Sequence, residues 1–179
     1  MPRRVSLLRE FMMRSTKTLC FIAMLLMLGS FTPSRVNAQS IYSERFDYKL
    51  YRSSAAYFLG KSTAWIDELC KAQHNASQED MDQCAHREFE DADDKLNKEL
   101  RLFSEKAARN DKSLKADNYP LAWPYFKNSQ DAWVQYRDNY CYGETYGLGQ
   151  ASMRYIVFWG CMERITKSRL QELKAPDAG

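Results

Sequence analysis

The chain has 179 residues, 45% of them apolar, which is enough for one domain with a single core. Its formal charge of +3 is unevenly distributed, because the first 38 residues hold six Lys and Arg and one Glu. Without that stretch, 20 basic and 22 acidic residues remain, a net charge of −2. The remaining composition therefore argues against a basic nucleic-acid-binding protein, and no nucleic acid partner is expected.

The first 38 residues have the three parts of a secretory signal peptide. Basic residues extend to Lys17, an apolar run follows over 19–28, and Val36-Asn37-Ala38 supplies a small-residue cleavage site. The run is too short to span a bilayer, so an uncleaved membrane anchor is the weaker alternative. Cys20 lies at the start of the run, whereas a lipid-modified cysteine follows its end. We expect cleavage between Ala38 and Gln39, which leaves a periplasmic or secreted chain of 141 residues without a stable membrane anchor.

Four cysteines remain after that cleavage: Cys70, Cys84, Cys141 and Cys161. An even number in a small exported domain is typical of two disulfides, and three connectivities are open. We favour Cys70–Cys84 and Cys141–Cys161, because each pair would close a local loop between successive helices.

Sparse glycine and proline predict helices over most of the remaining chain, because strands need turn residues about every 8–12 positions. A first helical stretch is expected over 46–58, with a break at Gly60 and a continuation over 65–70. Ser77 is the expected N-cap of a second, longer helix, whose apolar residues recur at three- and four-residue steps to Ala107.

An interruption is expected at 117–120, with Pro124 in or just before the first turn of a third long helix through Tyr140. Gly143, Gly147 and Gly149 predict a loop. A fourth helix is expected from about Gln150 to Leu173, and residues 175–179 form a frayed tail. The expected fold class is all-α, a disulfide-stabilised helical bundle of about four helices.

No strong motif for catalysis or for a cofactor is present in the sequence. The two histidines, His74 and His86, have no serine or cysteine nucleophile motif beside them. With Cys70 and Cys84 they could form a zinc site, but their spacing fits no common zinc module. Residues 147–152 resemble a phosphate-binding glycine loop, although no predicted strand precedes them as that mechanism requires. We expect a protein that is not an enzyme and that holds no metal or other cofactor.

Carboxylates crowd two turns of the second helix: Glu88, Glu90, Asp91, Asp93 and Asp94. Glu90 and Asp94 would share one helix face, and Asp93 another. Two interpretations stay open, a solvated acidic face or a patch that attracts a basic protein partner. Glycosidase chemistry would need two carboxylates across a cleft, and nothing in the sequence places them so.

Trp133, Arg137 and Cys141 lie four residues apart on one side of the third helix. A guanidinium among core aromatics is costly to bury alone, so an acidic partner is expected. Asp93 on the facing helix is the candidate. We interpret this pair as structural rather than catalytic.

Tyr142, Glu144 and Tyr146 fall in the expected loop between the last two cysteines. Exposed tyrosines on a disulfide-tethered loop suit protein recognition, and they equally suit a simple cover for the end of the bundle. The candidate partner-binding residues are therefore Glu88, Glu90, Asp91, Asp94, Tyr142, Glu144 and Tyr146.

Several short motifs recur in a fixed order along the chain: Cys70, Cys84, Ala92-Asp93, Leu96-Asn97, residues 130–138, Cys141, the glycine-rich segment, Cys161, Ile165-Thr166, Arg169 and Leu173. In order and spacing they resemble the LprI-like lysozyme inhibitor family, small exported helical domains with four cysteines. The resemblance implies a scaffold role for Asp93, Asn97, Trp133, Tyr136, Arg137, Asp138, Thr166 and Arg169.

The resemblance also implies a domain organisation and a function. Residues 70–174 would form the family domain, 39–69 an N-terminal helical extension, and the segment 114–125 a longer link than is usual in the family. The implied function is an exported binding protein that occludes a basic c-type lysozyme by protein–protein contact. The alternative is a structural or stress-related module of the cell envelope with another protein partner and no lysozyme activity. An enzyme acting on cell-wall glycan ranks below both.

Overall fold

The computed structural model describes residues 45–72 and 76–175, and all regular structure in these residues is helical. A 3₁₀ turn, η1 (Tyr48–Leu50), and two short helices, α2 (Ser54–Tyr57) and α3 (Thr63–Ala72), precede three long helices. The long helices are α4 (Gln78–Ala116), α5 (Trp123–Gly147) and α6 (Arg154–Lys174). The all-α prediction is confirmed, with five α-helices in the described ranges instead of about four. The predicted signal peptide and nearly all of the predicted tail lie outside these ranges.

α4 is the longest helix, and local hydrogen bonds explain where it begins and ends. The Ser77 hydroxyl accepts from the Asp80 N–H at 3.0 Å, and the Asp80 carboxylate accepts from the Ser77 N–H at 2.8 Å. This capping box confirms Ser77 as the N-cap. The helix ends at Ala116, and Asn118 takes a left-handed φ of 58°, which asparagine tolerates better than most residues.

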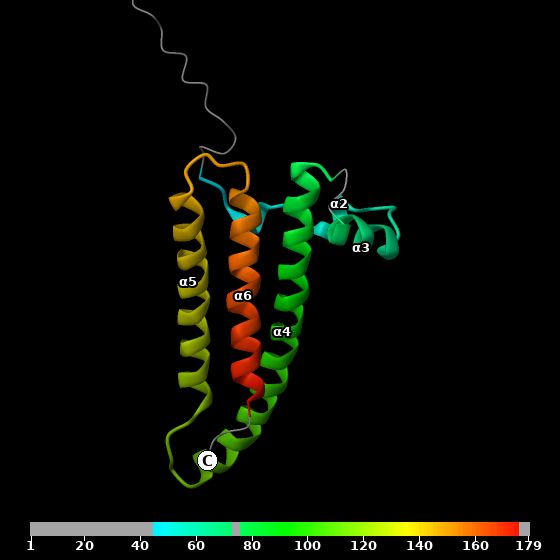
Figure 1. Ribbon diagram of the computed structural model, residues 1–179. Helices are drawn as coiled ribbons and strands as arrows, with labels where there is room; N and C mark the ends of the chain where they lie inside the picture. The colour runs from blue at the N-terminus through cyan, green and yellow to red at the C-terminus, as the bar shows by residue number, and fades with distance from the viewer. Residues whose placement is uncertain (1–44, 73–75, 176–179) are drawn as a thin grey trace, which may run out of the picture. The chain divides into compact units, whose positions relative to one another are not determined.

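α6 is the central helix, because it packs against both α4 and α5 and lies between them (Figure 1). It begins at Arg154, a few residues later than predicted. Its buried residues recur at helical spacing and meet side chains from both neighbours. The buried core cluster is Phe89, Cys141, Phe158, Trp159, Cys161, Met162 and Ile165.

The loop predicted from the glycines begins too early in the chain. α5 continues through Gly143 to Gly147, and Gly149 is the one glycine of the three that lies in the loop, with φ 61°. Cys141 and Thr145 are buried on the inner side of these last turns. That packing outweighs the roughly 1 kcal/mol that a glycine costs inside a helix.

The N-terminal segment, which we define as residues 45–58, is not the continuous helix that the sequence predicted. It contains η1 and the single turn of α2, with extended backbone on both sides of η1. Its rings reach the core directly. Phe46 meets Phe158 edge-on at 4.9 Å between ring centres, and Tyr51 lies 5.2 Å from Trp159. The segment thus buries its aromatic side chains by crossing the long helices, which one helical face would not allow.

Two disulfides join neighbouring helices, and both are the pairs that the sequence favoured. Cys70–Cys84 links α3 to α4, and Cys141–Cys161 links α5 to α6, with Cα atoms 5.4 and 5.6 Å apart. On the chain-entropy model, loops of these lengths contribute roughly 3 kcal/mol each to stability. Within the described ranges, none of the helices combines the length and the apolarity that crossing a bilayer requires.

Candidate binding site

Arg137 forms a buried polar centre where the three long helices meet. Its side chain is 5% exposed, and its guanidinium donates to Asp93 on α4 at 3.1 Å and to Asp138 on α5 at 3.0 Å. The Thr166 hydroxyl on α6 accepts a third hydrogen bond at 3.2 Å. The predicted ion pair between Arg137 and Asp93 is confirmed, and Asp138 is a second partner that the sequence did not indicate. Because one cation bonds to all three helices, the cluster fixes their register.

Aromatic rings complete the surroundings of this cation. The guanidinium of Arg137 lies 5.3 Å from the ring centre of Phe89 and 5.1 Å from that of Trp133, within the range of cation–π attraction. Arg169 approaches the Trp133 ring at 6.0 Å, so the motif residues of α5 and α6 lie together as a scaffold should. Tyr136 differs from the others, because it is 57% exposed and its ring lies outside this cluster.

Tyr48 connects the N-terminal segment to the Arg137 cluster. Its hydroxyl donates to Asp138 at 2.8 Å, and its backbone N–H donates to the hydroxyl of Tyr142 at 3.1 Å. Burial and the neighbouring Asp138 carboxylate raise the pKa of the Tyr48 hydroxyl, which therefore stays protonated and remains a donor. These bonds hold η1 against α5.

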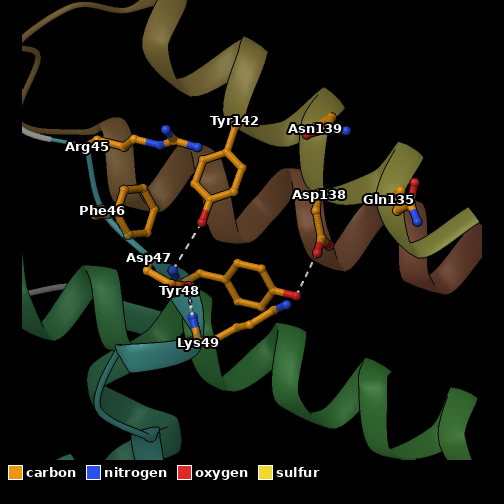
Figure 2. A pocket seen from close by; sticks show the side chains of 9 residues that line it. All are labelled: Arg45, Phe46, Asp47, Tyr48, Lys49, Gln135, Asp138, Asn139 and Tyr142. Carbon is orange, nitrogen blue, oxygen red and sulfur yellow. Dashed lines mark hydrogen bonds between the residues drawn. The ribbon is translucent and has the colours of Figure 1, made fainter. Parts of the chain in front are cut away.

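A pocket of about 500 Å³ opens beside Tyr48, between the N-terminal segment and α5. Figure 2 shows its walls: residues 45–49 on one side, and on the other a face of α5. The lining residues are Arg45, Phe46, Asp47, Tyr48, Lys49, Gln135, Asp138, Asn139 and Tyr142. This volume is in the range of small-molecule sites, roughly 300–1,000 Å³.

The polar groups of the pocket differ in whether they already have partners. Asp47 accepts from the Lys49 N–H at 3.0 Å, and Asp138 accepts from Arg137 and Tyr48. In the part of the chain that the structure describes, the exposed amides of Gln135 and Asn139 form no hydrogen bond. The sequence analysis missed these two residues. Their spacing of four on the helix, next to Asp138, was the one signal that they share a face.

The predicted acidic cluster does not form one surface. Asp93 is bound to Arg137 and accepts from the Asn97 amide at 2.9 Å, and Asp91 pairs with Lys95. Glu88 and Asp94 remain exposed on α4, without a hydrogen bond or ion pair to any described residue. Two of the carboxylates are therefore available for long-range attraction of a basic partner.

Glu90 points to the opposite side, where it holds the N-terminal segment on α4. It accepts from the backbone N–H of Ser54 at 3.3 Å and also from the Ser54 hydroxyl. His86 Nε2 lies 3.6 Å from a Glu90 oxygen, and burial lowers the pKa of this histidine. This order of contacts, serine to glutamate to histidine, lacks the serine–histidine bond of a hydrolase triad.

The two tyrosines expected on a loop lie instead on the last turns of α5. Tyr142 is half-buried, and its ring stacks on Tyr146 with centres 5.7 Å apart. The Tyr146 hydroxyl accepts from the Phe46 N–H at 3.3 Å, so both tyrosines contact the N-terminal segment. Glu144 faces the other way and pairs with Arg164 of α6 at 3.3 Å. The structure therefore separates the predicted recognition loop into a tyrosine pair that covers the core and one paired carboxylate.

The proposed zinc ligands are not available together. Cys70 and Cys84 are joined in a disulfide and cannot offer thiolates. His74 lies outside the described residues. Among residues 45–72 and 76–175, no three His, Cys, Asp or Glu side chains gather as metal ligands would.

Comparison with known proteins gives two matches. The model of the family described as lysozyme inhibitor LprI matches residues 70–173, which span α4, α5, α6 and all four paired cysteines. An uncharacterized protein of Rhizobium meliloti (strain 1021) is 34% identical over 100 residues, which is 55% of this chain and 72% of that protein. No solved structure matches the chain. The pocket beside Tyr48 has one wall inside the matched region and the other, residues 45–49, before it.

Proposed function

The chain belongs to the lysozyme inhibitor LprI family, and from this premise we propose that it is an exported protein that binds a basic c-type lysozyme and blocks its cleft. The observation that carries the proposal is the family match over all three long helices and both disulfides. Disulfides are typical of proteins that work outside the cytoplasm, which supports export to the periplasm or the medium.

The rigidity of the helices supports a binding role rather than a catalytic one. A surface carried by three helices that are cross-linked and joined through Arg137 loses little conformational freedom when it binds. Such an inhibitor needs no chemical step, because it acts by excluding the glycan from the enzyme. The surface itself would be the functional element.

Charge supports the choice of a basic partner. The chain after residue 38 carries a net charge of −2, and Glu88 and Asp94 present carboxylates to solvent on α4. Exposed charges of this kind raise the rate of encounter with an oppositely charged protein more than they raise the final affinity. Association should therefore weaken as salt rises, since the Debye length is about 8 Å at 0.15 M ionic strength.

A lysozyme lysis assay tests the proposal. The purified exported protein is titrated into lysozyme acting on bacterial cells, and the rate of lysis should fall as the molar ratio rises. Asp94→Lys should weaken inhibition about threefold, because a like charge then faces the enzyme. Glu105→Lys is the matched control, since it is the same change at another exposed carboxylate of α4 that lacks a described ion pair.

Undiminished lysis at large molar excess would contradict lysozyme inhibition. It would favour the alternative of an envelope interaction module with another protein partner. Equal effects of Asp94→Lys and Glu105→Lys would show that overall charge, and not the Glu88 and Asp94 region, determines the encounter.

A further inference from the structure

We propose that the pocket between the N-terminal segment and α5 binds a saccharide that carries a carboxylate group. This binding would be a second activity, independent of lysozyme inhibition, because an inhibitor that blocks a cleft needs a protruding surface and not a pocket. The proposal rests on the polar groups of the pocket that have no partner and on the rings that border them.

Gln135 and Asn139 supply the groups that recognise hydroxyls. Both lie on one face of α5, one turn apart, and both are exposed at the pocket. Each side-chain amide offers two N–H donors and one carbonyl acceptor. A sugar ring presents hydroxyls, and in amino sugars an acetamide, that both donate and accept. Two amides one helical turn apart match such a row of groups better than they match a purely anionic or purely apolar ligand.

The cations of the pocket indicate the carboxylate. Arg45 and Lys49 form no ion pair in the part of the chain that the structure describes, and the Lys49 ammonium lies 5.8 Å from the ring centre of Tyr48. Both lining carboxylates already accept hydrogen bonds, Asp47 from Lys49 N–H and Asp138 from Arg137 and Tyr48. The unpaired charges are thus positive, and a ligand carboxylate would satisfy them.

Aromatic rings form the rest of the wall. Phe46 and Tyr142 meet at 5.6 Å between ring centres in an edge-on arrangement, with the Arg45 side chain extending towards Tyr142 (Figure 2). Rings of this kind offer apolar area to the C–H groups of a sugar. Because Tyr142 is held by its bond to the Tyr48 N–H, this wall is in place before a ligand arrives.

Three small probes separate the features of the proposed ligand. N-acetylmuramic acid has the amino sugar and a carboxylate, N-acetylglucosamine has the same sugar without the carboxylate, and N-acetylalanine has a carboxylate without the sugar. Binding to the whole protein is measured by titration in NMR spectra. N-acetylmuramic acid should bind with a Kd at least about fivefold below those of the other two, which is the effect of one lost charged or polar contact.

Variants then locate the site. Asn139→Ala and Arg45→Ala should each raise the Kd for N-acetylmuramic acid about fivefold. Asn128→Ala and Arg101→Ala are matched controls, because they remove an exposed amide from α5 and an exposed guanidinium from α4 away from the pocket. All four changes are at exposed positions, so unchanged spectra elsewhere will show that the fold is kept.

Three outcomes would overturn the proposal. Absence of binding by any probe at millimolar concentration would exclude the saccharide. Equal binding of N-acetylalanine would reduce the site to a carboxylate-binding one, and equal binding of N-acetylglucosamine would exclude a role for Arg45 and Lys49. Binding that neither pocket variant weakens would place the ligand elsewhere. Because lysozyme inhibition is measured separately, its failure would leave these results standing.

Discussion

The two ends of the long helices are held together by different means. The disulfide end, comprising residues 45–99, 130–147 and 154–169, contains both disulfides, the N-terminal segment and the Arg137 cluster. The loop end, residues 100–129, contains the second half of α4, the connection and the start of α5. In the loop end Ala107 is the one buried residue, and the main contact is the stacking of Phe103 on Phe126 at 3.9 Å between ring centres.

This difference indicates where stability and function can be separated. The disulfide end has a buried core of aromatic side chains, cross-links and a bonded cation, so its surface is fixed. The loop end has half-exposed aromatic contacts and should open locally at lower free energy. Both proposed binding functions use residues of the disulfide end, where the geometry is preorganised.

The largest test of the comparison is the same substitution at both ends. Phe158 is 0% exposed, whereas Phe103 is half-buried. Phe158→Ala should lower the free energy of unfolding by about 3–5 kcal/mol, because it leaves a cavity in the core. Phe103→Ala should cost only about 1–2 kcal/mol, because the ring is partly solvated and its neighbours can relax.

Urea denaturation followed by far-UV circular dichroism measures both values. Equal losses in the two variants would contradict the comparison, since they would show that the stacking at the loop end matters as much as the buried core. An altered denaturant slope in one variant would point to a change in cooperativity and not in stability alone.

The sequence predicted those parts of the fold that depend on local patterns. Ser77 and Asp80 indicate a helix start by their own side chains, and the periodicity of α4 is strong enough to be recognised. The ion pair of Arg137 with Asp93 followed from the cost of burying an unpaired cation. In each case the deciding interaction lies within a few residues or rests on one dominant energy.

The parts that sequence reasoning missed depend on contacts between distant segments. The N-terminal segment takes its conformation from rings such as Phe46, whose partner Phe158 is more than a hundred positions away. The end of α5 continues past Gly143 because Thr145 is buried against the neighbouring helix, which no local glycine rule contains. The pocket was missed for the same reason, since its two walls meet only after folding.

A titrating carboxylate is the weak point of the disulfide end. Asp82 is 4% exposed on α4, and burial raises its pKa to about 6, although it accepts from the Gln78 amide at 3.0 Å. Because the folded pKa lies above the unfolded value, the unfolded state loses this proton first as the pH rises. Stability is therefore highest below about pH 4 for this group and falls as the pH rises to about 6.

Asp82→Asn removes this charge and keeps the acceptor for Gln78. It should raise the free energy of unfolding by on the order of 1–2 kcal/mol at pH 8 and change it little at pH 4. Urea denaturation at both pH values checks the expectation. A variant that is destabilised equally at both values would show that the carboxylate has a favourable partner at pH 8.

The smallest expected effect tests the loop end itself. α5 begins without a side-chain cap of its own, and Asp111 of α4 accepts from the N–H groups of Ala122 at 2.9 Å and Trp123 at 3.1 Å. Asp111→Ala should cost about 1 kcal/mol, the value of a lost helix cap. Hydrogen exchange should accelerate at the start of α5 and stay unchanged around Phe158. Asp117→Ala is the control, because it removes an exposed carboxylate nearby that accepts no hydrogen bond from a described residue. If protection fell equally at both ends, the two halves would unfold as one unit, and the preorganisation assigned to the disulfide end would belong to the helices as a whole.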